Sequence, residues 1–252
     1  MSYEKNIGQI ANAYKAIMKY SERDPWKEKL LITQRDFLLN VANSMDIEPA
    51  HLTKTLADND MAADVYGYIM EVMCSKRYQN EGSDTFTILA LEYLEKNSWK
   101  LKPFQKAFLQ ELPNTLFSFW RITKTSTNQV NFESYPFAGY QITLADGRFV
   151  EQMKTDDIVL TKLVKVEEEV YPGAIITTLK KELADAIIVE SHDNSIEFLN
   201  NYKKESEENP GSEILDDEFV KRIYVYNNLD YIIFKHWITD SYKKITNQTS
   251  GS

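Results

Sequence analysis

The sequence predicts an α+β protein that is mostly helical, with a small central antiparallel β-sheet or partly closed barrel. Apolar residues recur at three- and four-residue spacing over residues 1–113 and 172–246, which is typical of amphipathic helices. Residues 114–171 instead form a small β-rich module, with many β-branched and aromatic residues and the hairpin signal Asp146-Gly147. Residues 247–252 are expected to be a disordered tail.

Composition narrows the class of protein. The chain has 252 residues, 43% of them hydrophobic, which is enough apolar material for a real core. Its net charge of -9 disfavours non-specific binding to nucleic acid and to anionic membranes. The one cysteine, Cys74, excludes an internal disulfide and is expected to be buried. We expect a cytoplasmic protein, because no run approaches the ~18 apolar residues of a membrane span and no signal peptide is evident.

The N-terminal region is expected to hold six helices separated by Pro, Gly and Asp breaks. The apolar stripes cover residues 3–20, 26–41, 51–56, 65–73, 85–96 and 103–112. Pro25 and Pro103 suit first helical turns, because a missing N–H costs nothing there. The loop between the fourth and fifth helices is expected at residues 81–84.

The β-rich module is expected to contain several short strands. They are predicted at residues 117–123, 140–144, 149–153 and 157–166. Asp146-Gly147 should form the turn between the second and third of them, since glycine tolerates a positive φ. Pro172-Gly173 is expected to end the β region.

The C-terminal region is expected to be helical over residues 177–189 and again over 192–202, followed by a polar loop at 203–212. Residues 216–245 fit either a hairpin or a helix. A helix is preferred, because acidic residues gather at its start and basic residues at its end, which complements the helix dipole. These residues are Asp216, Asp217, Glu218, Lys243 and Lys244.

In a helix over residues 216–245, apolar side chains would cover more than half of the helix circumference. Such a helix is either central to the core or also faces a partner. The sequence predicts an exposed aromatic patch that binds a partner, because Tyr and Trp are favoured at interface centres. The residues are Tyr224, Tyr231, Trp237 and Tyr242. A simple core helix is the alternative.

The sequence contains no recognisable metal-binding, phosphate-binding or catalytic motif. The three histidines, His51, His192 and His236, are far apart, so no metal ligand is assigned. No glycine-rich phosphate loop or nucleophile elbow is present, so no cofactor and no catalytic residue is assigned. The paired acids Asp156-Asp157 and Asp216-Asp217 are interpreted as a turn and a helix N-terminus.

One segment mixes bases with aromatics in a way that suits nucleic acid. The candidate residues are Trp99, Lys100, Lys102 and Lys106. Such a patch can stack bases and contact phosphates. The alternative interpretation is a joint between two helices that carries solvated lysines.

The β-rich module resembles a module found in bacterial proteins that carry a zinc-binding SEC-C motif. The similar stretches lie within residues 108–176, at 116–122, 144–148 and 156–163. The resemblance implies a β-module between helices. It implies no metal site, because the cysteine-rich zinc motif is absent here.

Three classes of function follow from these observations. The leading hypothesis is a non-enzymatic protein-interaction or regulatory protein of bacterial or phage type, whose partner is another protein. The first alternative is a nucleic-acid-associated protein that uses the β-module and the Trp99–Lys106 patch. The second is a hydrolase whose site is assembled in space from distant residues, such as a histidine, a carboxylate and a hydroxyl. No membrane partner is expected, and the oligomeric state is left open.

Overall fold

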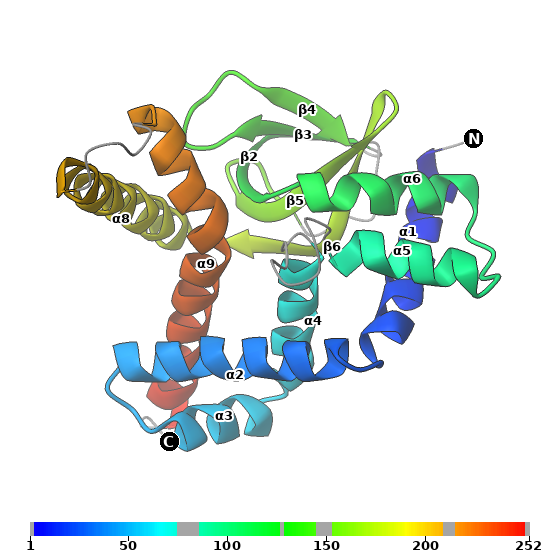
Figure 1. Cartoon of the computed structure of the whole chain (residues 1–252). Coiled ribbons are helices and arrows are strands. Elements are labelled where there is room, and N and C mark those ends of the chain that lie inside the picture. The colour runs from blue at the N-terminus through cyan, green and yellow to red at the C-terminus, as the bar shows by residue number, and fades with distance from the viewer. Residues whose placement is uncertain (1–2, 75–85, 127–128, 145–152, 209–214, 250–252) are drawn as a thin grey trace. The chain divides into compact units, whose positions relative to one another are not determined.

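The computed structural model describes residues 3–74, 86–126, 129–144, 153–208 and 215–249 (Figure 1). The chain divides into two compact units. The sheet unit comprises Met1–Asp36 and Asp60–Lys180, and the helical unit comprises Phe37–Asn59 and Lys181–Ser252. Each unit is described by itself below.

The predicted fold class is confirmed: the protein is mostly helical α+β, with an antiparallel sheet that does not close into a barrel. The helices are α1 (Tyr3–Ser21), α2 (Trp26–Ser44), α3 (Pro49–Asp58), α4 (Ala62–Met73), α5 (Phe86–Lys96), α6 (Pro103–Glu111), the 3₁₀ turn η1 (Leu112–Asn114), α8 (Lys181–Glu208) and α9 (Asp217–Thr249). The strands are β2 (Phe117–Ser126), β3 (Gln129–Ser134), β4 (Gln141–Leu144), β5 (Ile158–Val166) and β6 (Glu169–Leu179). Their order in the sheet is β4-β3-β2-β5-β6, and each neighbouring pair is antiparallel.

The sheet buries both of its faces along β5 and the first half of β2, whereas one face of β3 and β4 carries polar, more exposed side chains. On one face Phe117 stacks on Tyr68 of α4, with ring centroids 5.3 Å apart, and Tyr171 meets Phe104 of α6 at 4.8 Å. The other face packs on itself in a cluster of buried apolar side chains, which is possible because the sheet is strongly curled. This cluster consists of Trp120, Ile122, Val130, Phe132, Leu144, Met153 and Val159. The burial of both faces explains why the module contains so many β-branched and aromatic residues.

The expected end of the β region at Pro172-Gly173 is wrong, because β6 continues to Leu179. The helix predicted from residue 177 begins at Lys181 instead. β6 is an edge strand among the described residues, so Pro172 does not have to donate a ladder hydrogen bond. The sequence signal for a break therefore reflects an edge strand.

The C-terminal region is more helical than expected. α8 runs unbroken to Glu208, so residues 203–208 of the predicted polar loop are helical. The preferred helix over 216–245 is confirmed, and it extends to Thr249, into the predicted tail. Asp216 starts it by accepting hydrogen bonds from the N–H groups of Glu218 and Phe219 at 3.0 and 3.1 Å. The predicted turn at Asp146-Gly147 and the predicted loop at 81–84 lie outside the described residues, as does most of the predicted strand at 149–153.

A buried ion pair ties the sheet to the helices of its unit. Lys162 of β5 and Glu71 of α4 are 0% and 1% exposed. The Lys162 Nζ donates to the main-chain oxygen of Glu71 at 2.7 Å and lies 4.0 Å from its Oε1. The Tyr14 hydroxyl of α1 donates to the same Oε1 at 3.0 Å and accepts from the N–H of Ala174 in β6 at 3.1 Å. The cluster therefore joins four elements.

Gly173 is required by this cluster. A Cβ at this position would lie 2.9 Å from Glu71 Oε1 and 3.3 Å from Lys162 Cβ. Both distances are shorter than ordinary contacts, and both neighbours are held in the buried cluster. Only glycine lets β6 approach so closely.

The first prediction concerns the ion pair. Lys162→Met should lower the free energy of unfolding by about 3–5 kcal/mol, because it leaves the Glu71 carboxylate buried without its cation. Urea unfolding followed by circular dichroism measures this. The double variant Glu71→Leu, Lys162→Met should lose less than the sum of the two single losses. Strict additivity would show that the two side chains do not interact.

The second prediction concerns alkaline pH. Burial, followed by the nearby Glu71 carboxylate, raises the pKa of the Cys74 thiol from 9.0 to about 12. The pKa of the thiol is higher in the folded state than in the unfolded state. The contribution of the protonated thiol to the free energy of unfolding is therefore complete below pH 9 and is lost as the pH rises toward 12. Between these limits the wild type should lose about 1.4 kcal/mol per pH unit more than Cys74→Ala. Equal slopes for the two proteins in urea unfolding between pH 9.5 and 11 would contradict this.

Candidate functional site

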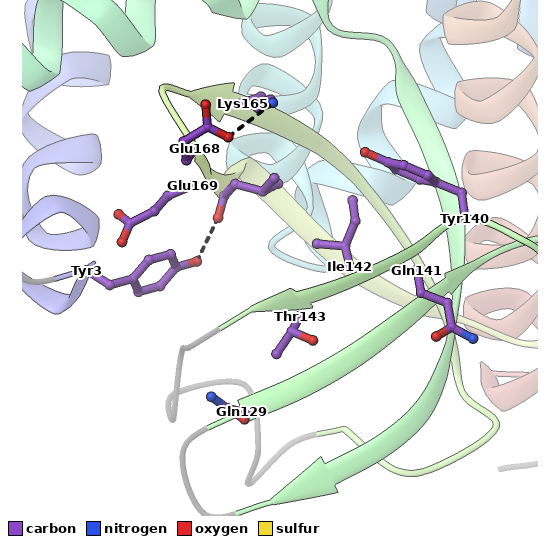
Figure 2. A pocket seen from close by; sticks show the side chains of 10 residues that line it. Tyr3, Gln129, Tyr140, Gln141, Ile142, Thr143, Lys165, Glu168 and Glu169 are labelled. Atoms are coloured by element: carbon purple, nitrogen blue, oxygen red, sulfur yellow. Dashed lines mark hydrogen bonds and ion pairs between the residues drawn. The ribbon is translucent and has the colours of Figure 1, made fainter.

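A cleft of about 410 Å³ opens between the two edge strands of the described sheet, β4 and β6 (Figure 2). These strands stand at opposite ends of the strand order, and they border one cleft because the sheet curls. The lining residues are Tyr3, Gln129, Tyr140, Gln141, Ile142, Thr143, Lys165, Glu168, Glu169 and Val170. All of them belong to the sheet unit.

The β6 wall of the cleft is held by tyrosines. Tyr3 of α1 donates to the carbonyl of Val170 at 3.0 Å (Figure 2). Its ring also stacks on Tyr171, with ring centroids 4.8 Å apart. The Tyr171 hydroxyl donates to Glu169 and accepts from the Asn6 amide at 2.8 Å. Burial, followed by Glu169, raises the pKa of Tyr171 to about 12. This hydroxyl therefore stays protonated at neutral pH, and its hydrogen bonds hold β6 in place beside α1.

The β4 wall presents main-chain groups. The N–H of Ser134 donates to the carbonyl of Tyr140 at 2.8 Å, which makes these two residues a hydrogen-bonded pair. Hydrogen-bonded and non-hydrogen-bonded pairs alternate in an antiparallel ladder. The N–H and C=O groups of Gln141 and Thr143 therefore point away from β3. Among the described residues, no strand pairs with β4 on that side.

A short turn supplies the charge at the mouth of the cleft. Glu167 and Glu168 join β5 to β6, and Glu167 has a φ of 56°. The Glu168 side chain is 97% exposed and lies 3.9 Å from the Lys165 ammonium. Ion pairs this exposed contribute little to stability, so these charges are available to a ligand. The cleft offers hydrogen bonds and negative charge, and no nucleophile paired with a base.

The residues of the predicted nucleic-acid patch are exposed, but two of them already contact other side chains of the protein. Trp99 is 42% exposed, and the ammonium of Lys19 from α1 lies 4.5 Å from the centre of its ring. Lys106 forms an ion pair with Glu95, whereas Lys100 and Lys102 are exposed. Sequence reasoning did not include Lys19, because 80 residues separate it from Trp99. A base would have to displace this cation to reach one face of the indole.

The four aromatic residues predicted to bind a partner are half-buried. Tyr224 meets the Phe198 ring of α8 at 5.4 Å, and Tyr231 meets Phe37 at 5.4 Å. Trp237 contacts Phe234 of its own helix at 5.9 Å, and Tyr242 lies 6.1 Å from the His51 ring. Their role in binding stays a prediction.

Other aromatic residues on α8 and α9 are more exposed. Phe219 and Tyr226 of α9 are 52% and 38% exposed, and Phe198 of α8 is 39% exposed. Phe219 and Tyr226 are seven residues apart, so they share one face of the helix. Sequence reasoning did not select them, because the apolar pattern alone does not show which part of the helix surface is covered.

Among the described residues, the histidines form no hydrolytic triad. His236 Nε2 lies 2.8 Å from Glu190 Oε2, and the Lys235 ammonium lies 2.9 Å from Glu190 Oε1. Burial raises the pKa of Glu190, but hydrogen bonds from Lys235 and His236 outweigh it, so the net shift is downward. Among the described residues no hydroxyl hydrogen-bonds to His236, and His192 contacts only the exposed Asp193. The cluster links α8 to α9.

The acidic pairs take the structural roles expected from the sequence. Asp156 has a φ of 73°, and Asp157 Oδ2 accepts from the Lys154 N–H at 2.8 Å, which builds a turn before β5. Within the described ranges, no three His, Cys, Asp or Glu side chains gather as metal ligands. No helix in those ranges is long and apolar enough to cross a membrane.

Comparisons with known proteins give no relative. No known protein family, no curated protein and no solved structure matches this chain.

The third prediction concerns nucleic acid. The protein should bind a fluorescein-labelled oligothymidylate only at low salt, because Lys106 is paired and the net charge opposes phosphates. Fluorescence anisotropy over a salt series measures this. Tight binding at physiological salt that Trp99→Ala abolishes would contradict it and favour the nucleic-acid alternative.

Proposed function

We propose that this is a non-enzymatic protein-interaction or regulatory protein whose partner is another protein. The observation that supports this best is the exposed aromatic face that Phe219 and Tyr226 form on one side of α9, called the α9 face below. It lies on a long helix of the helical unit.

The two halves of α9 differ in their surroundings. The second half buries Ile233, Phe234 and Ile238, and Phe234 meets Phe37 of α2 at 5.3 Å. The first half carries Phe219, Ile223 and Tyr226 at helical spacing, and none of these is buried. A surface helix normally exposes its polar side, so an exposed apolar stripe favours a binding role.

Two ion pairs lie near the start of α9. Lys203 pairs with Asp217 at 2.7 Å, and Lys221 pairs with Glu218 at 2.7 Å. Phe and Tyr rings bury a large area at a low cost in conformational entropy, so Phe219 and Tyr226 suit the centre of an interface. Charged side chains near an interface help to exclude wrong partners.

Three further parts of this proposal rest on the sequence. The cytoplasm is the proposed location, since the single thiol of Cys74 is free and buried. A bacterial or phage origin is proposed with it. The resemblance of residues 108–176 to the β-module of SEC-C-motif proteins is likewise kept as a proposal.

The fourth prediction tests the α9 face. The double variant Phe219→Ser, Tyr226→Ser should lose binding of a partner by at least ten-fold, because it removes two central aromatic anchors. Affinity purification from the native host, followed by titration of the recovered protein, measures this.

A matched control is available on another exposed apolar residue. Leu31→Ser in α2 changes a side chain that is also largely exposed, and it should leave partner binding unchanged. Both variants should unfold at wild-type urea concentration. Equal partner binding by the double variant and the wild type would refute the role of this face.

A further inference from the structure

We propose that a cationic surface around Trp99 binds an acidic segment of another protein, which places carboxylates on the lysines and an apolar side chain beside the indole. The surface is called the Trp99 surface below and consists of Lys15, Lys19, Trp99, Lys100, Lys102 and Lys106. All of these residues belong to the sheet unit, so the proposal does not depend on the α9 face.

Two stretches of the chain that contain lysines and no acids meet at this surface. Residues 5–21 carry three lysines without an aspartate or glutamate, and residues 96–106 carry four. Helices α5 and α6 both pack on α1 (Figure 1). The Lys19 ammonium of α1 lies 4.5 Å from the centre of the Trp99 ring, which joins the two stretches. A cationic surface therefore forms on a chain whose net charge is -9.

The lysines of the Trp99 surface repel one another, and an acidic partner relieves this repulsion. Lys15 and Lys19 are four residues apart on α1, so they lie on the same side of the helix. Lys100 and Lys102 are both exposed and are separated only by Leu101, immediately before α6. Carboxylates placed between such lysines are attracted by several cations at once, which favours an acidic partner over a neutral one.

Trp99 supplies apolar contact area within this surface. It is 42% exposed even though the Lys19 ammonium lies over its ring. The ring therefore holds that cation in place and still offers part of the indole to a leucine or phenylalanine of the partner. Tryptophan is enriched among the residues that dominate interface energies. A segment with an apolar residue among its acids thus fits better than a purely acidic one.

The acids beside this surface favour a polypeptide over nucleic acid. Lys106 forms an ion pair with Glu95, and Glu92 lies three residues earlier on α5. A nucleic acid carries a phosphate at every nucleotide and would be repelled by these carboxylates, whereas a polypeptide can place an uncharged residue there. The next cation along the chain, Arg23, donates to the Tyr93 hydroxyl and lies 4.2 Å from the centre of its ring. The surface therefore presents lysines rather than the arginine fork that suits phosphate.

Charge reversal at two exposed lysines tests the proposal. The probe is a fluorescein-labelled decapeptide of glutamates with one central leucine, and fluorescence anisotropy at physiological salt measures its binding. The test variant is Lys100→Glu, Lys102→Glu, which should fold because acidic residues at the start of α6 complement the helix dipole. The matched control is Lys124→Glu, Lys180→Glu, which changes the net charge equally at exposed lysines elsewhere in the sheet unit.

We expect the test variant to bind the acidic peptide about ten-fold more weakly than the wild type, and the control to lose less than about two-fold. Trp99→Ala should weaken binding of the leucine-containing peptide about five-fold, because it removes the apolar contact. The same variant should leave binding of a peptide with serine in place of leucine unchanged. Urea unfolding of each variant checks that the fold is intact.

Several outcomes would overturn the proposal. These are no saturable binding of the acidic peptide at millimolar concentration, equal losses in the test variant and the control, or equal binding of a peptide in which lysines replace the glutamates. An oligothymidylate of equal charge that binds more tightly than the acidic peptide, and that the test variant no longer binds, would assign the surface to nucleic acid. Phe219→Ser, Tyr226→Ser should leave peptide binding unchanged, which separates this test from that of the α9 face.

Discussion

The buried contact between Lys162 and Glu71 is the constraint on which the sheet unit depends. A charge inside a protein is tolerated only when it is paired and hydrogen-bonded, and here the ammonium finds both a carbonyl and a carboxylate of the same residue. Since the two residues come from β5 and α4, the position of the helix on the sheet is fixed to within the length of a hydrogen bond. An apolar pair would tolerate sliding of α4 across the strand, whereas this pair does not.

That constraint extends to the sheet edge. Glu71 also accepts from Tyr14, and the same tyrosine takes the N–H of Ala174, so α1 is aligned along β6. The alignment brings Tyr3, three helical turns earlier, to the carbonyl of Val170. Gly173 lies between these two contacts because the strand passes directly over the Glu71 carboxylate. One buried charge therefore sets how α1 covers the β6 edge of the cleft.

The sequence was sufficient for features that depend on local pattern. Apolar spacing predicted the N-terminal helices, and the charges around Asp216 correctly favoured a helix over a hairpin for α9. It failed where a distant contact changes the meaning of a residue: Pro172-Gly173 reads as a break, yet both residues serve an edge strand that passes over Glu71. The cleft was equally out of reach, because Tyr3 and Val170 meet across 167 positions. The sequence predicted aromatic residues on α9, but it could not show which faces of that helix are covered, because this depends on contacts with distant residues such as Phe37 and Phe198.

The distribution of satisfied and open groups favours binding over chemistry. The titratable side chains with the best geometry already have partners within the fold: Glu190 holds Lys235 and His236, and Glu71 holds Lys162. The fold holds these groups in position through their partners. Exposed groups of another kind are the rings of Phe219 and Tyr226. Exposed aromatic rings supply binding energy without bond making, which supports the proposal that this protein acts by binding another protein.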